Sequence, residues 1–99
     1  MYTRKKIAEA TGLTERQVLF FTERGLVSIG NKHPGSGQAR IYSEHNLNEF
    51  RIIRDLHEVG LRARLIKRIL RSDHNSFHEK MEDAHIIRQR LLKYSDLLS

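Results

Sequence analysis

The sequence predicts a mainly α-helical chain in which short helices flank a short two-stranded segment and a long helix of coiled-coil type follows. Three observations predict this class. Gly12, Gly25 and Gly60 each follow a stretch with helical spacing of apolar residues and each precede a leucine, as glycines at helix ends do. Residues 30–39 are rich in glycine and lie between two apolar runs. The apolar residues after position 76 repeat about every 3.5 residues.

Two short helices are expected at the start of the chain. Thr3 can cap a helix over residues 4–11, because a threonine hydroxyl accepts a hydrogen bond from a free backbone N–H at a helix start. Thr14 and Gln17 have the spacing of a capping box. A second helix is therefore expected directly after the Gly12 turn.

These two helices have the spacing of a helix-turn-helix. Ala8 is small where the helices would cross closely, Gly12 can adopt the positive φ of the turn, and Val18 supplies an apolar anchor from the second helix. An ordinary helical hairpin would accommodate the same residues. The spacing alone leaves both interpretations open.

A short strand pair is expected next. Residues 26–29 and 40–42 are apolar and partly alternating, which is typical of short strands. The ten residues between them hold three glycines and the single proline, and they make a longer loop than a tight hairpin needs. This loop is either a wing that follows a phosphate backbone or an ordinary surface loop. Lys32, His33 and Gln38 would project from it.

Two further helices follow. Ser43 is expected to cap a helix that ends near Val59. Its apolar face consists of Leu47, Phe50, Ile53 and Leu56. After Gly60 another helix is expected, with Arg62 and Arg64 at its start. Since helix starts disfavour cations, these arginines indicate either a bound phosphate or two tolerated surface side chains.

The last helix carries a heptad pattern. Its apolar residues advance by 4, 3, 3, 4, 3 and 4 positions, which is the repeat of a coiled-coil seam. The seam consists of Phe77, Met81, Ala84, Ile87, Leu91, Tyr94 and Leu98. Pairing with a second copy would bury it, and folding back onto the same chain is the alternative. The pattern is still running at Leu98, which suggests a truncated chain.

The net charge of +6 is unevenly distributed along the 99 residues. Residues 1–72 carry 14 Lys and Arg against 7 Asp and Glu, whereas residues 73–99 carry 4 against 5. A basic segment of this kind is a candidate footprint for nucleic acid, since neutralised phosphates release counterions. A role in solubility alone is the alternative. We expect a DNA-binding domain over residues 1–72 and a dimerisation helix over residues 73–99.

Several classes of protein find little support. The chain has no cysteine, so it can form neither a disulfide nor a thiolate metal site. No apolar stretch suits a membrane span or a signal peptide, and we expect a cytoplasmic protein. The sequence contains neither a nucleophile with an evident base nor a phosphate-binding glycine motif, so nothing in it indicates an enzyme. His74, His78 and His85 share a helix face and could bind a metal, but we expect solvated histidines and no cofactor.

The order of these parts resembles the MerR family of bacterial transcription regulators. The resemblance covers residues 2–71 and rests on four motifs in order: Ile7-Ala8-Glu9-Ala10-Thr11-Gly12-Leu13-Thr14, Glu23-Arg24-Gly25-Leu26-Val27, Gly37-Gln38-Ala39-Arg40-Ile41-Tyr42-Ser43 and Gly60-Leu61. It implies a winged helix-turn-helix whose second helix lies in the major groove, and a last helix that forms an antiparallel coiled coil between subunits. It also implies a homodimer on a pseudo-palindromic promoter, which the dimer distorts for RNA polymerase.

The candidate DNA contacts follow from this layout. Arg16 and Gln17, in the first turn of the second helix, are candidates for base edges. Phosphate contacts are expected from Thr14, Arg24, Arg40, Arg62, Arg64 and Lys67. Phe20 would touch a thymine methyl group or pack against the wing. Tyr42 would offer its hydroxyl to a phosphate or sit half-buried in a strand.

One departure from the family pattern and two alternative functions stay open. The family has an arginine and two tyrosines where this chain has Leu19, Phe20 and Phe21, so familiar backbone contacts are missing. An excisionase-like or architectural DNA-bending protein is the main alternative, although such proteins lack a long dimer helix. A protein-interaction module that uses the seam for another partner is a third.

Overall fold

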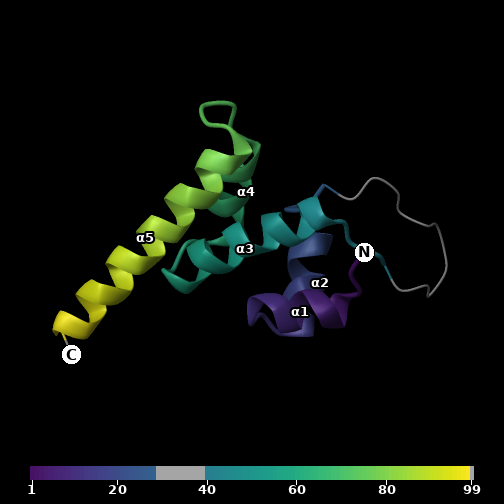
Figure 1. Ribbon diagram of the computed structural model, residues 1–99, viewed down its shortest axis with the longest axis horizontal. Helices are drawn as coiled ribbons and strands as arrows, with labels where there is room; N and C mark the ends of the chain where they lie inside the picture. Colours follow the sequence, from purple (N-terminus) through teal and green to yellow (C-terminus); the bar gives the residue numbers. More distant parts are fainter. Residues whose placement is uncertain (29–39, 99) are drawn as a thin grey trace. The chain divides into compact units, whose positions relative to one another are not determined.

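A computed structural model describes residues 1–28 and 40–98, and for residues 94–98 it describes the backbone alone. Five helices are present in this part of the chain, α1 (Arg4–Thr11), α2 (Glu15–Glu23), α3 (Glu44–Glu58), α4 (Ala63–Arg71) and α5 (Phe77–Leu98) (Figure 1). All five were predicted from the sequence, with ends close to those expected. The chain divides into two compact units, Met1–Phe50 and Arg51–Ser99, so that the boundary falls within α3. The expected boundary after residue 72 is a functional one and stays a prediction.

The caps of the first unit follow the predicted pattern. The Thr3 hydroxyl accepts a hydrogen bond from the backbone N–H of Lys6 at 3.2 Å. Gly12 closes α1 with φ 80°, and its N–H donates to the carbonyl oxygen of Ala8 at 2.8 Å. Residues with a Cβ rarely adopt this backbone conformation, so the glycine at position 12 allows the sharp turn between α1 and α2.

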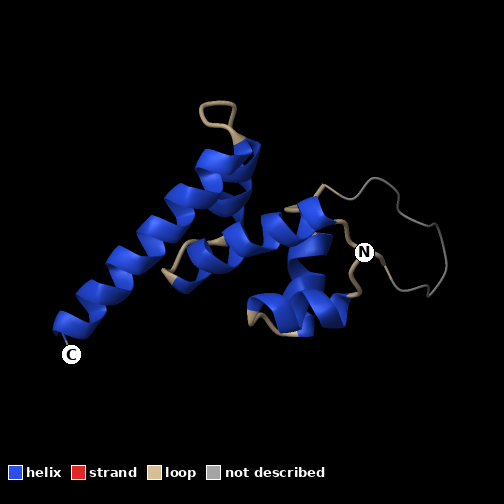
Figure 2. Ribbon diagram, viewed as in Figure 1, coloured by secondary structure: helices blue, strands red, loops and turns tan. Residues whose placement is uncertain are grey.

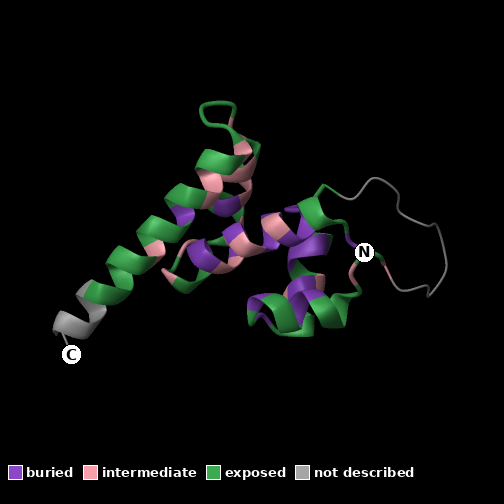
Figure 3. Cartoon of the chain, in the orientation of Figure 1, coloured by how far each residue is buried: buried purple, intermediate pink, exposed green. Residues whose placement is uncertain are grey.

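The core of the first unit is built from one face of each helix. Ile7 of α1, Val18 and Phe21 of α2, and Leu47 and Phe50 of α3 are at most 3% exposed, and Figure 3 shows the buried faces of these helices. Burial of each such side chain contributes roughly 1.5–3 kcal/mol before entropic costs. The two helices of the predicted helix-turn-helix pack directly on each other, and this packing fixes the face that α2 turns outward.

The expected strand pair is not found in residues 1–28 and 40–98 (Figure 2). Tyr42 instead pairs with Tyr2 in an isolated antiparallel bridge, with N···O distances of 2.8 and 2.7 Å. Ser28, after the buried Leu26 and Val27, is held by the Glu49 carboxylate, which accepts hydrogen bonds from its N–H and its hydroxyl at 3.1 Å each. The Ser28 N–H is thus satisfied by a side chain, and the Leu26 N–H by the carbonyl oxygen of Phe21 at 3.1 Å, where the prediction expected a strand ladder.

The second unit joins the end of α3 to α4 and α5. Ile52, Ile53 and Leu56 of α3 and Ile66 of α4 are at most 2% exposed. Gly60 ends the α3 segment with φ 97°, and the N–H of Leu61 donates to the carbonyl oxygen of Leu56 at 3.1 Å. This closure satisfies carbonyl groups that the helix end would otherwise leave unpaired.

Polar contacts fix α5 within the second unit. Lys80 donates hydrogen bonds to the carbonyl oxygens of Leu70, at 3.1 Å, and Ser72 at the end of α4. Arg88 pairs with Glu58 and lies 3.6 Å from Asp55, both on α3. The hydrogen bond with Glu58 raises the pKa of Arg88 above its usual value. The first half of α5 is therefore bound to its own chain.

Candidate nucleic-acid interface

The outward face of α2 is the candidate interface of the first unit. Val18 is fully buried and Phe21 is 2% exposed. Arg16, Phe20 and Arg24, spaced four residues apart, are exposed on the other side of the helix. This face joins two cations to one aromatic ring, and it is defined here as the α2 face.

Arg16 lies in the first turn of α2 and meets the requirements of a base-reading side chain. It is exposed and makes no ion pair with any described residue. Its neighbour Glu15 lies 3.5 Å from Arg4 of α1, so the acidic group of this turn has a partner elsewhere. A guanidinium in this position can donate two parallel hydrogen bonds to a guanine edge.

Phe20 and Arg24 form a cation–π pair at the centre of the α2 face. The Arg24 guanidinium carbon lies 4.8 Å from the centre of the Phe20 ring. The same ring meets Phe21 edge to face, with centroids 5.4 Å apart and an interplanar angle of 73°. Arg–aromatic spacing of four residues was the signal in the sequence for this pair, which the sequence analysis missed.

The side chains of Thr14 and Gln17 are engaged in the predicted capping box. The Thr14 hydroxyl accepts a hydrogen bond from the Gln17 N–H at 3.0 Å, and the Gln17 side-chain oxygen accepts one from the Thr14 N–H at 2.9 Å. Gln17 would have to leave this cap to read a base with its whole amide group. Arg16 is therefore the stronger candidate of the two for a base contact.

Tyr42 does not fit the expected phosphate contact, and this expectation is corrected. Its side chain is 1% exposed, and its hydroxyl lies 2.8 Å from the hydroxyl of Thr22. Thr22 already uses its one proton in a 2.7 Å hydrogen bond to the carbonyl oxygen of Val18. Tyr42 must therefore be the donor between the two hydroxyls, and it holds the end of α2 from inside the core.

The remaining predicted contacts of the first unit lie around the segment after Ser28. Arg40 is half-buried, next to the exposed Ile41. Lys32, His33 and Gln38 lie outside the described residues. Of these four predicted contacts, Arg40 is the one whose position the structure gives.

The second unit carries its own cations at the start of α4. Arg62 occupies the N-cap position with an extended backbone, and its side chain makes no capping hydrogen bond. Arg62 and Arg64 are exposed, and Lys67 is half-buried. The predicted unusual start of this helix is confirmed, because two cations stand where an anion would satisfy the free N–H groups.

Comparison with known protein families matches residues 2–73 to the family described as MerR HTH family regulatory protein. The match spans 72 of the 99 residues, counting both ends. The chain belongs to the MerR family. Comparison with curated proteins found no match, and comparison with solved structures found none either. Membership confirms the resemblance seen in the sequence, and it supports DNA binding and transcription regulation through the helix-turn-helix.

The three residues of α2 that depart from the MerR pattern differ in their exposure. Leu19 is half-buried and Phe21 is buried, whereas Phe20 is 41% exposed. Of the three residues that replace the arginine and the two tyrosines of the MerR pattern, Phe20 alone is presented on the α2 face.

Other kinds of site find no support in the described part of this MerR chain. His78 lies 3.1 Å from Glu82, and no group of three metal-binding side chains occurs among the described residues. None of the described helices has both the length and the apolar character that a membrane span requires.

Proposed function

We propose that this chain is a sequence-specific regulator of transcription that binds double-stranded DNA as a homodimer. The α2 face carries the proposal. It is exposed, it belongs to the second helix of a helix-turn-helix, and it presents Arg16, Phe20 and Arg24 at intervals of about one turn. A helix of about 10 Å diameter with such side chains fits the major groove.

The cations outside the α2 face would supply affinity that is independent of sequence. Arg40, Arg62 and Arg64 are at least partly exposed, and arginine is well suited to phosphate. Each phosphate that they neutralise would release condensed counterions, so binding would weaken as salt rises. Base reading by α2 and phosphate binding by these cations are therefore proposed as two separate contributions to DNA affinity.

The dimer would form through the second half of α5. Ala84 is 2% exposed and Phe77 and Met81 are half-buried within the chain itself, so the part of the seam that follows them offers more apolar surface to a partner. Ile87 and Leu91 are 41% and 45% exposed. They continue the heptad pattern, and an antiparallel coiled coil with a second copy would bury them.

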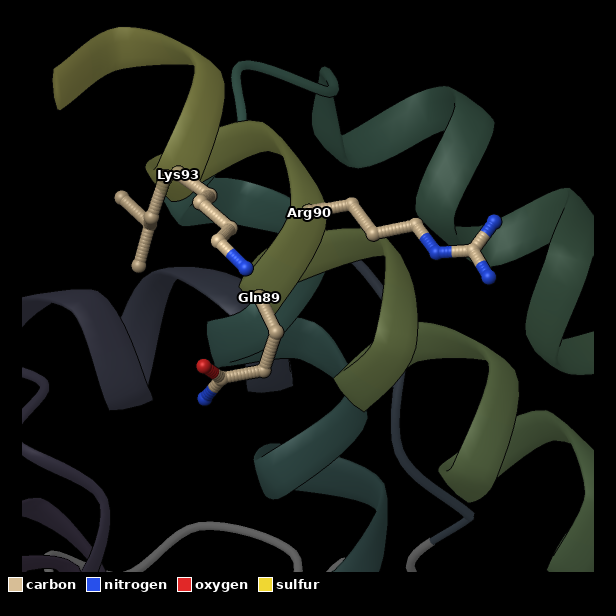
Figure 4. Close-up of a pocket in the computed structure, with 4 residues that line it drawn as sticks. Gln89, Arg90 and Lys93 are labelled. Carbon is tan, nitrogen blue, oxygen red and sulfur yellow. The ribbon is translucent and has the colours of Figure 1, made fainter. Parts of the chain in front are cut away.

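Figure 4 shows the polar side of the same stretch of α5. An open hollow is lined there by Gln89, Arg90, Leu92 and Lys93, and Arg90 points away from the other two labelled side chains. All four residues belong to one helix, so the hollow does not enclose a small molecule. This side would stay in solvent when Ile87 and Leu91 pair with a partner helix.

The target would be a pseudo-palindromic promoter site. A two-fold symmetric dimer presents two copies of α2 and therefore matches an inverted repeat. By its resemblance to MerR regulators, the dimer would distort the DNA between the half-sites and so help RNA polymerase to engage the promoter. The energy for such distortion would come from the phosphate contacts on either side.

Selection of binding sites from a pool of random duplexes tests this function. We expect enrichment of one sequence made of two inverted half-sites. The logarithm of the affinity is expected to fall linearly with the logarithm of the salt concentration. A pool that enriches no sequence would contradict sequence-specific binding. Enrichment of a single site without an inverted repeat would contradict binding as a symmetric dimer.

A further inference from the structure

Phe20 is an exposed apolar side chain on a face that is otherwise cationic. It is 41% exposed, although three of its neighbours on α2 (Leu19, Phe21 and Thr22) are buried or half-buried. An aromatic ring contributes nothing to phosphate binding, and exposing it to water is unfavourable. The exposed part of the ring therefore offers an apolar contact to the surface that the α2 face meets.

The ring is held in one orientation. Arg24 lies over it at 4.8 Å and Phe21 meets it edge to face at 5.4 Å. Phe21 is itself buried in the core at 2% exposure, so one of the two contacts is rigid. A fixed ring keeps its exposed part available without the entropic cost of ordering it on binding.

Only one apolar group projects from the base edges into the major groove, namely the C5-methyl group of thymine. Phe20 lies one turn after Arg16, which is the candidate for a base contact. Resting on the proposed DNA binding, we infer that Phe20 reads a thymine methyl group in each half-site, next to the base read by Arg16. Arg24, while stacked on this ring, is placed beside the groove where the phosphates lie.

Replacement of single thymines by uracil tests this inference, because uracil keeps the base pairing and lacks only the methyl group. The duplex is the one obtained by selection, and each thymine is replaced in turn. Each half-site is expected to contain one thymine whose replacement by uracil lowers the affinity of the wild-type protein about fourfold. This factor corresponds to ~0.8 kcal/mol per buried methyl group. Replacement in both half-sites is expected to cost about fifteenfold, the product of two such effects.

The Phe20→Ala variant completes the test. It is expected to bind the thymine and uracil duplexes equally, whereas Leu19→Ala, a control one residue away on the same helix, keeps the difference. The inference is overturned if the wild type distinguishes thymine from uracil at no position, or if Phe20→Ala keeps the wild-type ratio. Failure of the wild type to bind any duplex would instead overturn the proposed function, and this inference with it.

Discussion

Replacing Tyr42 with phenylalanine separates a structural role of this side chain from a DNA contact. The substitution removes one hydroxyl and keeps the ring, which meets Phe50 at 5.5 Å with an interplanar angle of 83°. Only one oxygen atom and its proton are removed, so the packing of the ring changes little. The change therefore isolates the hydrogen bond that the buried hydroxyl donates to Thr22.

The expected loss can be worked out from that hydrogen bond. A buried hydrogen bond contributes about 0.5–1.5 kcal/mol net. Thr22 keeps its own hydrogen bond to the Val18 carbonyl oxygen, so its hydroxyl is not left entirely unpaired. We expect the free energy of unfolding to fall by about 1 kcal/mol, and the melting midpoint to fall by about 4–8 °C.

Urea and thermal unfolding at equal protein concentration measure this loss, since the concentration affects a dimer's stability. Tyr2→Phe is the matched control. The hydroxyl of Tyr2 donates a hydrogen bond to Glu44 at 2.5 Å on the exposed surface. We expect its removal to lower the free energy of unfolding by less than about 0.5 kcal/mol. Duplex affinity and its salt dependence are expected to stay unchanged for Tyr42→Phe. Unchanged stability together with weaker DNA binding would refute the placement of Tyr42 in the core.

Three further substitutions probe other parts of the chain. Arg40→Ala is expected to weaken all duplexes alike and to flatten the slope of log affinity against log salt by about one; an unchanged slope would exclude a phosphate contact. Leu91→Asp is expected to convert a dimer to a monomer in sedimentation, because a charge would enter the coiled-coil seam; a persistent dimer would place the interface elsewhere. Glu49→Ala is expected to cost about 2–3 kcal/mol in urea unfolding, since Ser28 and Asn46 lose a buried acceptor. Glu9→Ala, an exposed change on α1, should cost less than about 0.5 kcal/mol, and equal losses would contradict a role for the buried network.

The helices could be predicted because their signals are local. The Thr14 and Gln17 capping box, the positive φ of Gly12 and the apolar face of α3 all depend on residues within one or two turns. The same local reasoning predicted that Val18 is an apolar anchor, and its burial fixes which side of α2 faces outward.

The errors came from contacts between residues far apart in the sequence. Tyr42 pairs with Tyr2, 40 positions away, and bonds to Thr22; no periodicity within residues 40–42 indicates either partner. Asn46 and Glu49 were not predicted to be buried, yet they are 4% and 6% exposed. They are tolerated because each is hydrogen-bonded to the other and to Ser28.

The seam of α5 shows a further limit of periodicity. A repeat of 3.5 residues identifies one apolar face, but it does not say which part of that face packs on the same chain. Lys80 and Arg88 decide this through polar contacts with α4 and α3. Ala84 of the seam is buried within the chain and Phe77 and Met81 are half-buried, whereas Ile87 and Leu91 are exposed.

The most direct test of DNA reading by α2 compares wild-type protein with Arg16→Ala on the selected duplex and on a duplex with both half-sites scrambled. Lys6→Ala serves as a control that removes the same charge from an exposed position on α1. The account predicts that Arg16→Ala weakens the selected duplex by about 1–3 kcal/mol, or roughly 5- to 150-fold, with little change on the scrambled one. Equal weakening of both duplexes, or no weakening of either, would contradict it.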